Sequence, residues 1–238
     1  MPGLGTIINV AAILLAGLLG SLLGKILQPH IQEGLMKATG LCVLFIGLAG
    51  AMEHMLSIQS GGLTSGKSML LIGCFAPGTL LGAWLNLESR LEQFGTWLKI
   101  KTGSQQDGGF VGAFVDATMT VCIGAMAVVG SLEDGIAGDH SLLVAKAVLD
   151  FIIIFVMTSS LGRGCAFAAI PVGIFQGLIT LLARFIAPVI TATAQDYLSL
   201  TGSILIFAVG VNLIWGKKLP VANMLPTLVF AVIAALLG

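Results

Sequence analysis

Long apolar stretches separated by short polar breaks dominate the chain. Their hydrophobic residues run continuously and do not alternate with polar ones, which indicates helices and argues against an outer-membrane β-barrel. Most stretches hold about 17–23 residues, the length that crosses a hydrocarbon core about 30 Å thick. The pattern predicts eight membrane spans, at approximately 4–24, 36–52, 68–86, 109–130, 141–159, 164–187, 199–215 and 221–238.

The last predicted span is the weakest of the eight, because Pro220 and Pro226 interrupt its start. If it does not cross the membrane, the chain has seven spans. Backbone N–H and C=O groups find no water inside a bilayer, so each span must satisfy them internally as a helix. The sequence therefore predicts an all-α, polytopic transmembrane helical bundle that forms a single membrane domain over 1–238.

Composition supports a membrane protein and excludes several other classes. Hydrophobic residues make up 57% of the 238 residues and charged residues 9%, whereas soluble domains carry roughly 25% charged residues. So much apolar surface cannot be buried in one soluble core of this size, which excludes a soluble enzyme, a nucleic-acid-binding protein and a disordered chain. Basic and acidic residues balance, at 11 each, so no overall electric field selects a charged partner.

The sequence carries no pattern typical of catalysis or of a resident metal. The four cysteines lie in apolar stretches, without the spacing of a zinc site or of a disulfide scaffold. The segment 61–68 fits the letters of a phosphate-binding loop, but no strand precedes it and no nucleotide-binding domain surrounds it. We therefore expect no enzyme activity, no catalytic residues, no metal and no cofactor.

Basic residues divide unevenly between the two sets of loops that eight spans create. One set holds eight of the 11 Lys and Arg residues, and the other holds two, Lys67 and Arg184, while Lys146 lies inside a span. The positive-inside rule places the richer set in the cytoplasm. We therefore expect a multi-pass protein whose two termini both lie outside the cytoplasm.

The two ends of the chain show a distant internal similarity. Residues 39–45 resemble 201–207, and residues 17–26 resemble 177–186 once a short insertion is allowed. Spans 1–3 would then correspond to spans 6–8 as an inverted repeat, because an odd number of spans separates the partners. Inverted repeats are the architecture of many secondary transporters. Chance matching between helices rich in Gly and Leu is the alternative.

The predicted repeats divide the chain into three parts. The N-terminal three-span half, 1–107, ends in an amphipathic helix over 87–102 that we expect on the membrane surface, because its apolar residues recur at helical spacing. A central two-helix hairpin occupies 108–160. The C-terminal three-span half occupies 161–238.

Three charged residues lie inside predicted spans and away from their ends, where such residues usually face a bundle interior or a wet cavity. Asp116 lies on span 4, and Lys146 and Asp150 lie one turn apart on span 5. Counted at 1.5 Å per residue, the two carboxylates fall about 12–15 Å from the cytoplasmic ends of antiparallel helices. We therefore expect both carboxylates in one cavity, with Lys146 as the counter-charge. The alternative is an ion pair that locks spans 4 and 5 together.

Other candidates for a substrate or ion path are polar or helix-breaking residues. Thr120 lies one turn after the first aspartate and can share its stripe. Pro77 and Gly78 predict a break in the middle of span 3, and broken helices often form transport sites at the membrane midplane; a packing kink is the alternative. Gln176 and Asn212 complete the set, although hydrogen bonding between helices is the default role for a lone amide.

Several segments together resemble one known family. The stretch 121–135, followed by Gly138-Asp139, is similar to the signature of the YqgA/YdfK-type bacterial inner-membrane proteins, and 34–40, 145–150 and 169–172 also resemble family segments. The resemblance covers essentially the whole chain. It implies a helical fold, an inner-membrane location and a transport role without a defined substrate. The family often has Pro where Ala125 stands here, which weakens the case for a helix break in span 4.

These patterns predict a secondary transporter of a small solute or ion, with the Asp116, Lys146 and Asp150 cluster in the path of the substrate or coupling ion. A membrane scaffold whose charges are structural, or an ion channel, is the alternative. Gly-xxx-Gly pairs such as Gly20/Gly24 and Gly173/Gly177 allow close helix contact, so we expect a homodimer or a higher homo-oligomer. The expected partners are the lipid bilayer and a small solute or ion, with no nucleic acid.

Overall fold

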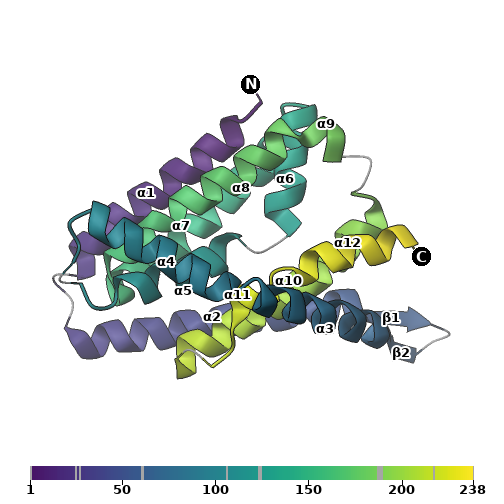
Figure 1. Cartoon of the computed structure of the whole chain (residues 1–238), viewed down its shortest axis with the longest axis horizontal. Helices are drawn as coiled ribbons and strands as arrows, with labels where there is room; N and C mark the ends of the chain where they lie inside the picture. Colours follow the sequence, from purple (N-terminus) through teal and green to yellow (C-terminus); the bar gives the residue numbers. More distant parts are fainter. Residues whose placement is uncertain are drawn as a thin grey trace.

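The structure is a computed structural model, and it describes residues 2–24, 26, 28–59, 62–105, 107–122, 125–186, 190–216 and 218–237. Nearly every described segment is helical, so the predicted all-α class is confirmed (Figure 1). The exception is an antiparallel hairpin of two four-residue strands, β1 (Leu56–Gln59) and β2 (Gly62–Ser65), which the sequence pattern did not predict.

The N-terminal half contains two long helices and one bent pair. α1 (Leu4–Gly24) matches the first predicted span, and α2 (Pro29–Met55) extends the second span at both ends. After the hairpin, α3 (Ser68–Trp84) and α4 (Leu87–Lys101) meet at an angle of 50°. Asn86, at the junction, has a left-handed backbone with φ of 54°, which turns the chain between these two helices.

The segment 108–160, predicted as a central hairpin, contains a bent pair of helices and a continuous helix. α5 (Phe110–Cys122) and α6 (Ala125–Ile136) are bent by 61° relative to each other. The two residues between them, 123 and 124, lie outside the described residues. α7 (Ser141–Leu161) is unbroken and corresponds to span 5.

The C-terminal half begins with a 3₁₀ helix, η1 (Arg163–Ala168), which leads directly into the next α-helix. Its remaining elements are α8 (Ala169–Leu181), α9 (Ala183–Ile186), α10 (Ala192–Trp215), α11 (Val221–Met224) and α12 (Thr227–Leu237). α11 and α12 separate at Leu225-Pro226, where the sequence predicted an interruption.

The helix lengths fit five to seven membrane crossings. Five helical segments of the described chain are long and apolar enough to cross, and the bent pairs α3–α4 and α5–α6 raise the number to seven if each is one span. The segment Val221–Leu237 is apolar but shorter. An eighth span therefore stays a prediction, as does the division of the chain into two halves and a hairpin.

Two groups of helices lie side by side and meet where α2 packs on α7 and at α5 (Figure 1). In one group α1 packs on α7 and α8, and α6 also packs on α7 and α8. In the other group α2 packs on α10, and α12 packs on α10 and α3. α5 contacts α7 and α8 on one side and α10 on the other, and its Phe110 and Phe114 are fully buried in the core. The helix that carries Asp116 therefore occupies the junction between the groups.

Glycines bring α2 and α10 into close contact and reveal their relative direction. A side chain at Gly47 would meet the backbone of Phe207, and one at Gly40 would meet Ile214. Positions in contact descend along α10 as they ascend along α2, so the helices are antiparallel. By the same comparison α3 is antiparallel to the consecutive helices α11 and α12, because Gly78 would meet Thr227 and Gly82 would meet Asn223, and α1 is parallel to α7. These directions agree with an eight-span path through the membrane.

Each helix of the first predicted repeat contacts its expected partner in the second. α1 packs on α8, α2 packs on α10, and α3 packs on α12. Two inverted copies related by a two-fold axis would produce these pairings. The inverted repeat stays a prediction, which these pairings support.

The break predicted at Pro77 and Gly78 is absent, because α3 remains helical through both residues. Proline removes one backbone donor, and the rest of the helix continues around it. Gly78 instead allows a close approach to Thr227 of α12. The sequence signal thus reflects packing between two helices, which was the alternative to a break.

The amphipathic helix predicted over 87–102 is α4, and its apolar face packs on α5. Leu98 is buried, Gly95 lies against the Phe114 ring, and the Phe94 and Phe114 ring centroids are 5.9 Å apart. Trp97 of the same helix is half exposed. The apolar face therefore makes contacts inside the protein, and contact with the membrane surface stays a prediction for the exposed residues alone.

Candidate functional site

The ion pair predicted on α7 is present and buried. Lys146 Nζ lies 2.5 Å from Asp150 Oδ2, and the two side chains are only 8% and 5% exposed. The same ammonium group donates a hydrogen bond of 2.7 Å to the carbonyl oxygen of Val121, near the end of α5. Asn9 Nδ2, on α1, donates to Asp150 Oδ2 at 3.0 Å. The pair thus joins α7 to both α1 and α5.

Gln176 extends this network to α8. Its Oε1 accepts a long hydrogen bond of 3.4 Å from Asn9 Nδ2, and the Gln176 side chain is buried. Asn9 Oδ1 and Gln176 Nε2 have no partner among the described residues. The predicted role of Gln176 in hydrogen bonding between helices is therefore present, whereas its place in a substrate path stays a prediction.

Asp116 lies in a different environment. It is half-buried on α5 and lines a cavity of about 90 Å³ enclosed by α4, α5, α10 and α11. Glu88 and Glu92 of α4 line the same cavity, whose wall is otherwise mainly apolar. All three carboxyl groups have interaction partners, and within the described chain no group of three or more acidic, His or Cys residues could hold a metal ion. The cavity therefore gathers acidic groups without forming a metal centre.

The structure does not bring Asp116 and Asp150 into one cavity, contrary to the expectation from their depth. Neither Asp150 nor Lys146 lines the cavity of Asp116. Counting residues along a helix gives the depth of a side chain in the membrane. The rotation of the helix about its own axis decides which neighbouring helix that side chain faces. Asp116 lies beside α4 and α10, whereas Asp150 faces α1. Thr120 donates at 2.7 Å to the Asp116 backbone carbonyl, so its hydroxyl bonds within its own helix.

Asn212 shares the wall of the Asp116 cavity and also organises the chain after α10. Its Nδ2 donates to the Leu219 carbonyl at 2.8 Å, and its Oδ1 accepts from the backbone N–H groups of Lys218 and Leu219 at 2.9 Å. These bonds fold the chain back toward α11. The sequence candidates therefore separate into two sites, with Asn212 beside Asp116 and Gln176 beside Asp150.

The sequence did not predict a reciprocal contact between the starts of α4 and α11. Glu88 N donates to Asn223 Oδ1 at 2.9 Å, and Ala222 N donates to Glu88 Oε2 at 3.0 Å. Each side chain accepts a hydrogen bond from an otherwise unpaired donor in the first turn of the other helix. An acidic residue early in a predicted helix is a recognisable signal, but its partner more than 130 positions away is not.

A second cluster, formed by charged and ionisable side chains at the ends of other helices, was also not predicted from the sequence. Asp196, on α10, pairs with Lys67 Nζ at 2.5 Å and with His54 Nδ1 at 2.9 Å. Lys67 also donates to the His54 carbonyl at 2.7 Å, and its backbone is left-handed with φ of 65°. The cluster joins the end of α2 to the starts of α3 and α10.

Asp134 falls between the predicted spans 109–130 and 141–159. The structure places it on α6, where its side chain is buried and accepts a hydrogen bond from Gly5 N at 3.0 Å.

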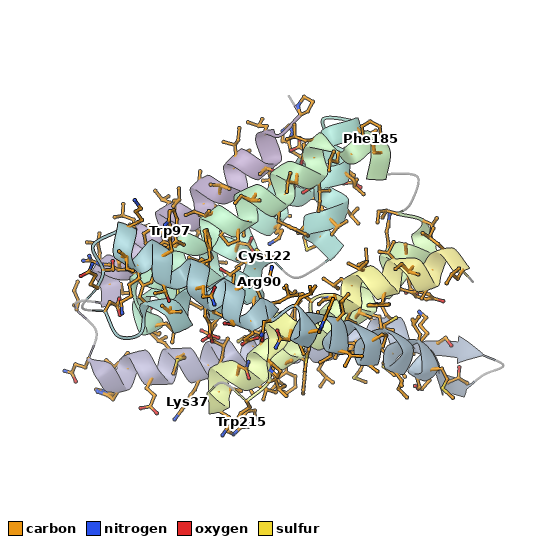
Figure 2. All side chains as sticks on the ribbon, viewed as in Figure 1. Lys37, Arg90, Trp97, Cys122, Phe185 and Trp215 are labelled. Atoms are coloured by element: carbon orange, nitrogen blue, oxygen red, sulfur yellow. The ribbon has the colours of Figure 1, made fainter. Side chains whose placement is uncertain are left out.

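A larger and mostly apolar cavity of about 410 Å³ lies beside the acidic one. Arg90 and Cys122 belong to its wall and lie near the centre of the molecule (Figure 2). Met119 and Ala222 line both cavities. The acidic and the apolar cavity therefore share these two side chains in their walls.

Comparisons with known proteins place the chain in a family. The family described as "Protein of unknown function (DUF554)" matches residues 4–236. The "Uncharacterized membrane protein YdfK" of Bacillus subtilis (strain 168) is 29% identical over 224 residues, which cover 94% of this chain and 92% of that protein. The "Uncharacterized protein YqgA" of Escherichia coli (strain K12) is 27% identical over 228 residues, which cover 96% and 94%. No solved structure matches the chain. The resemblance to YqgA/YdfK-type proteins is confirmed, and the chain belongs to the DUF554 family of membrane proteins.

Proposed function

We propose that this protein is a secondary transporter of a small solute or ion across the bacterial inner membrane, with Asp116 in the path of the coupling ion. The observation that supports this proposal is the cavity that Asp116 shares with Glu88 and Glu92. Carboxylates inside an apolar bundle are costly and mark ion or proton pathways. Three acidic side chains around one small cavity concentrate negative charge there, which attracts a cation.

The arrangement of the helices supports movement around this cavity. Alternating access needs two bodies that rock against each other around a fixed site. The two helix groups meet at α5, which carries Asp116, and where α2 packs on α7, and α4 and α11 begin at the cavity wall. A proton or cation at Asp116 changes the local charge and so shifts the balance between two packings of these groups.

Within this proposal, Lys146 and Asp150 hold the helices and do not bind the coupling ion. Their charges compensate each other, and their hydrogen bonds go to α1 and α5. A cation at Asp150 would have to displace the Lys146 ammonium group. The functional part of the predicted charge cluster is therefore Asp116, and the Lys146–Asp150 pair gives it a rigid support.

The proposed orientation places both termini outside the cytoplasm. The His54, Lys67 and Asp196 cluster joins three segments that the eight-span path puts outside. The bond from Gly5 to Asp134 joins two more such segments. Figure 1 shows the β-strands and α9 toward one end of the molecule and the ends of α1 and α4 toward the other. This separation supports a path in which alternate connections face opposite sides.

Charge displacement on a solid-supported membrane tests the proposal without knowledge of the substrate. The full chain in proteoliposomes receives rapid jumps of pH or of Na⁺ concentration, and the transient current reports ion binding. We expect a transient in the wild type, its loss in Asp116→Asn, and no change in Glu133→Gln, which alters an exposed carboxylate on α6. Equal elution volume and melting temperature show that the variants fold. A transient of wild-type size in Asp116→Asn contradicts the proposal.

The same recording separates the two alternatives. The buried Lys146–Asp150 pair favours a membrane scaffold as the second candidate, because a compensated pair is suited to holding helices together. A scaffold gives no transient after either jump. An ion channel gives a sustained current that follows the ion gradient, and neither result is compatible with coupled transport.

A further inference from the structure

A polar cavity of about 330 Å³ lies apart from the sites described above, where the ends of α1 and α7 meet η1 and the segment before α5. Its wall contains four hydroxyl side chains and two charged ones: Ser21, Thr158, Ser159, Ser160, Asp107 and Arg163. Its volume lies at the lower end of the range for small-molecule pockets, roughly 300–1,000 Å³. The cavity is therefore large enough for a small polar ligand.

The two charges in this wall are opposite in sign but do not pair. Asp107 Oδ1 accepts from Gly109 N at 3.1 Å, a bond within its own turn. None of the ion pairs between described residues joins Asp107 to Arg163, and no hydrogen bond in the described chain uses Asp107 Oδ2 or the Arg163 guanidinium. A negative and a positive group thus line one cavity and remain available for a ligand.

Gly162 shapes the wall between these charges. Its backbone has φ of 100°, which a residue with a side chain rarely adopts, and a Cβ at this position would lie 3.6 Å from Asp107 Oδ2. Glycine therefore both permits the turn from α7 into η1 and leaves the outer edge of the Asp107 carboxylate uncovered.

One hydroxyl group of the wall is buried without a partner. Ser21 and Ser159 donate back to carbonyl oxygens of their own helices at 2.8 Å. Thr158 interacts with the Cys165 thiol, whereas Ser160 Oγ has no hydrogen-bond partner in the described structure. Buried polar groups are normally hydrogen-bonded, so the Ser160 hydroxyl points to a ligand in the cavity.

We propose that this cavity binds a small zwitterion of the α-amino-acid type and is the substrate site of the transporter, an assignment that rests on the proposed function. The ammonium group of the ligand faces Asp107 Oδ2. Its carboxylate faces the Arg163 guanidinium, whose planar fork suits carboxylate geometry. Ser160 supplies a further hydrogen bond. A simple anion would be repelled by Asp107 and a simple cation by Arg163, so the separated charges select a ligand that carries both.

Binding to the full chain in detergent or nanodiscs, measured by calorimetry and by thermal stabilisation, tests this assignment. The probes are L-alanine and L-serine, with propionate and ethylamine as analogues that lack the amino and the carboxyl group of alanine. We expect at least one amino acid to bind and both analogues to fail. Equal binding of propionate or ethylamine, or no binding of either amino acid, overturns the assignment.

Variants connect this binding to the cavity. Asp107→Asn and Arg163→Gln should each weaken amino-acid binding by about 10- to 100-fold, the usual effect of losing one charge-assisted contact. Ser160→Ala removes the unpartnered hydroxyl and should weaken binding several-fold. Glu133→Gln and Lys101→Gln change exposed charges that are not among the residues of the cavity wall, and should bind as the wild type does. Wild-type affinity in both Asp107→Asn and Arg163→Gln contradicts the assignment.

This inference and the proposed function can fail separately. If the amino acids do not bind but Asp116→Asn still loses its charge displacement, the zwitterion site is wrong and coupled transport stands. If an amino acid binds through Asp107 and Arg163 but neither ion jump gives a transient current, the site stands as a binding site and the transport proposal fails.

Discussion

Asn9 and Asp150 are 141 positions apart, yet Asn9 Nδ2 donates to Asp150 Oδ2 at 3.0 Å. The contact joins α1 to α7, two parallel helices packed along their length. The same oxygen lies 2.5 Å from Lys146 Nζ. One carboxylate oxygen therefore takes two donors and fixes the register of α1 against α7. Removing Lys146 leaves Asp150 as a buried anion with only an amide for support.

Lys146→Ala should lower the free energy of unfolding by about 3–5 kcal/mol, the usual cost of removing one partner from a buried ion pair. The loss arises because Asp150 remains in the interior without its counter-charge. Unfolding in mixed detergent micelles, followed by circular dichroism, measures the change. A loss below about 1 kcal/mol would show that Asp150 has another source of compensation.

The double variant Lys146→Met with Asp150→Leu is the matched control. It replaces both charges by apolar groups of similar length, and such replacements are often neutral or stabilising. We expect it to be more stable than Lys146→Ala alone. Retained charge displacement in the double variant would also support the assignment of this pair to a structural role.

The positions of the helices could be predicted well from the sequence, whereas the side-chain contacts between helices could not. α1 matches its predicted bounds because an apolar run ends there at the first polar residues. Asp116 and Asp150 were expected together because depth can be counted along a helix, but rotation about the helix axis depends on the packing of every neighbour. The Glu88–Asn223 contact and the His54–Asp196 pair join segments over 130 positions apart, and no local pattern signals them.

The close packing of α2 on α10 predicts opposite effects for two Gly→Ala substitutions. Gly47→Ala should destabilise the protein by about 1–3 kcal/mol or more, because the added methyl group would meet the backbone of Phe207. Gly73→Ala, in the middle of α3, meets no atom within 4 Å and should gain up to about 1 kcal/mol of helix propensity. Melting temperatures of the two variants, measured side by side, check the prediction. Equal shifts in both would contradict the α2–α10 contact.

The reciprocal bonds between Glu88 and Asn223 predict coupled effects on stability. Each of Glu88→Ala and Asn223→Ala should cost about 0.5–2 kcal/mol, the range for loss of a helix-capping acceptor. The two costs should not add, because each substitution already weakens the junction at which α4 and α11 begin. A double-mutant cycle from denaturation curves measures the coupling. Strict additivity would indicate that the two hydrogen bonds act independently.

Assembly into a homodimer or larger oligomer stays a prediction, and the structure changes its basis. Gly20 and Gly24 lie against Thr158 and Ser159 of α7, so this pair serves contacts within one chain. Gly177 meets no atom within 4 Å and remains available for a second copy. Native mass spectrometry in nanodiscs should give a multiple of 24.5 kDa, and Gly177→Leu should shift it toward one copy. A wild-type mass of a single chain would refute the prediction.

The predicted orientation gives opposite labelling at the two ends of the molecule. Ser65, on β2, and Lys101, at the end of α4, are both exposed and lie on opposite sides of the eight-span path. In a variant without native cysteines, Ser65→Cys should react with a membrane-impermeant maleimide in cells whose outer membrane or cell wall has been permeabilised and whose inner membrane is intact. Lys101→Cys should react only after the inner membrane is permeabilised. The positive-inside rule supports this direction, because Lys101 belongs to the loop set that is rich in basic residues.

The C-terminus then decides between eight spans and seven. A reporter that is active only in the cytoplasm should be silent after Gly238, because the segment Val221–Leu237 would return the chain to the outside. A fusion after Gly216, before that segment, should be active and serves as the matched control for expression. An active reporter at both positions, combined with the expected maleimide pattern, would mean that the last segment does not cross. Reversal of the maleimide pattern would instead overturn the orientation while leaving the helix packing intact.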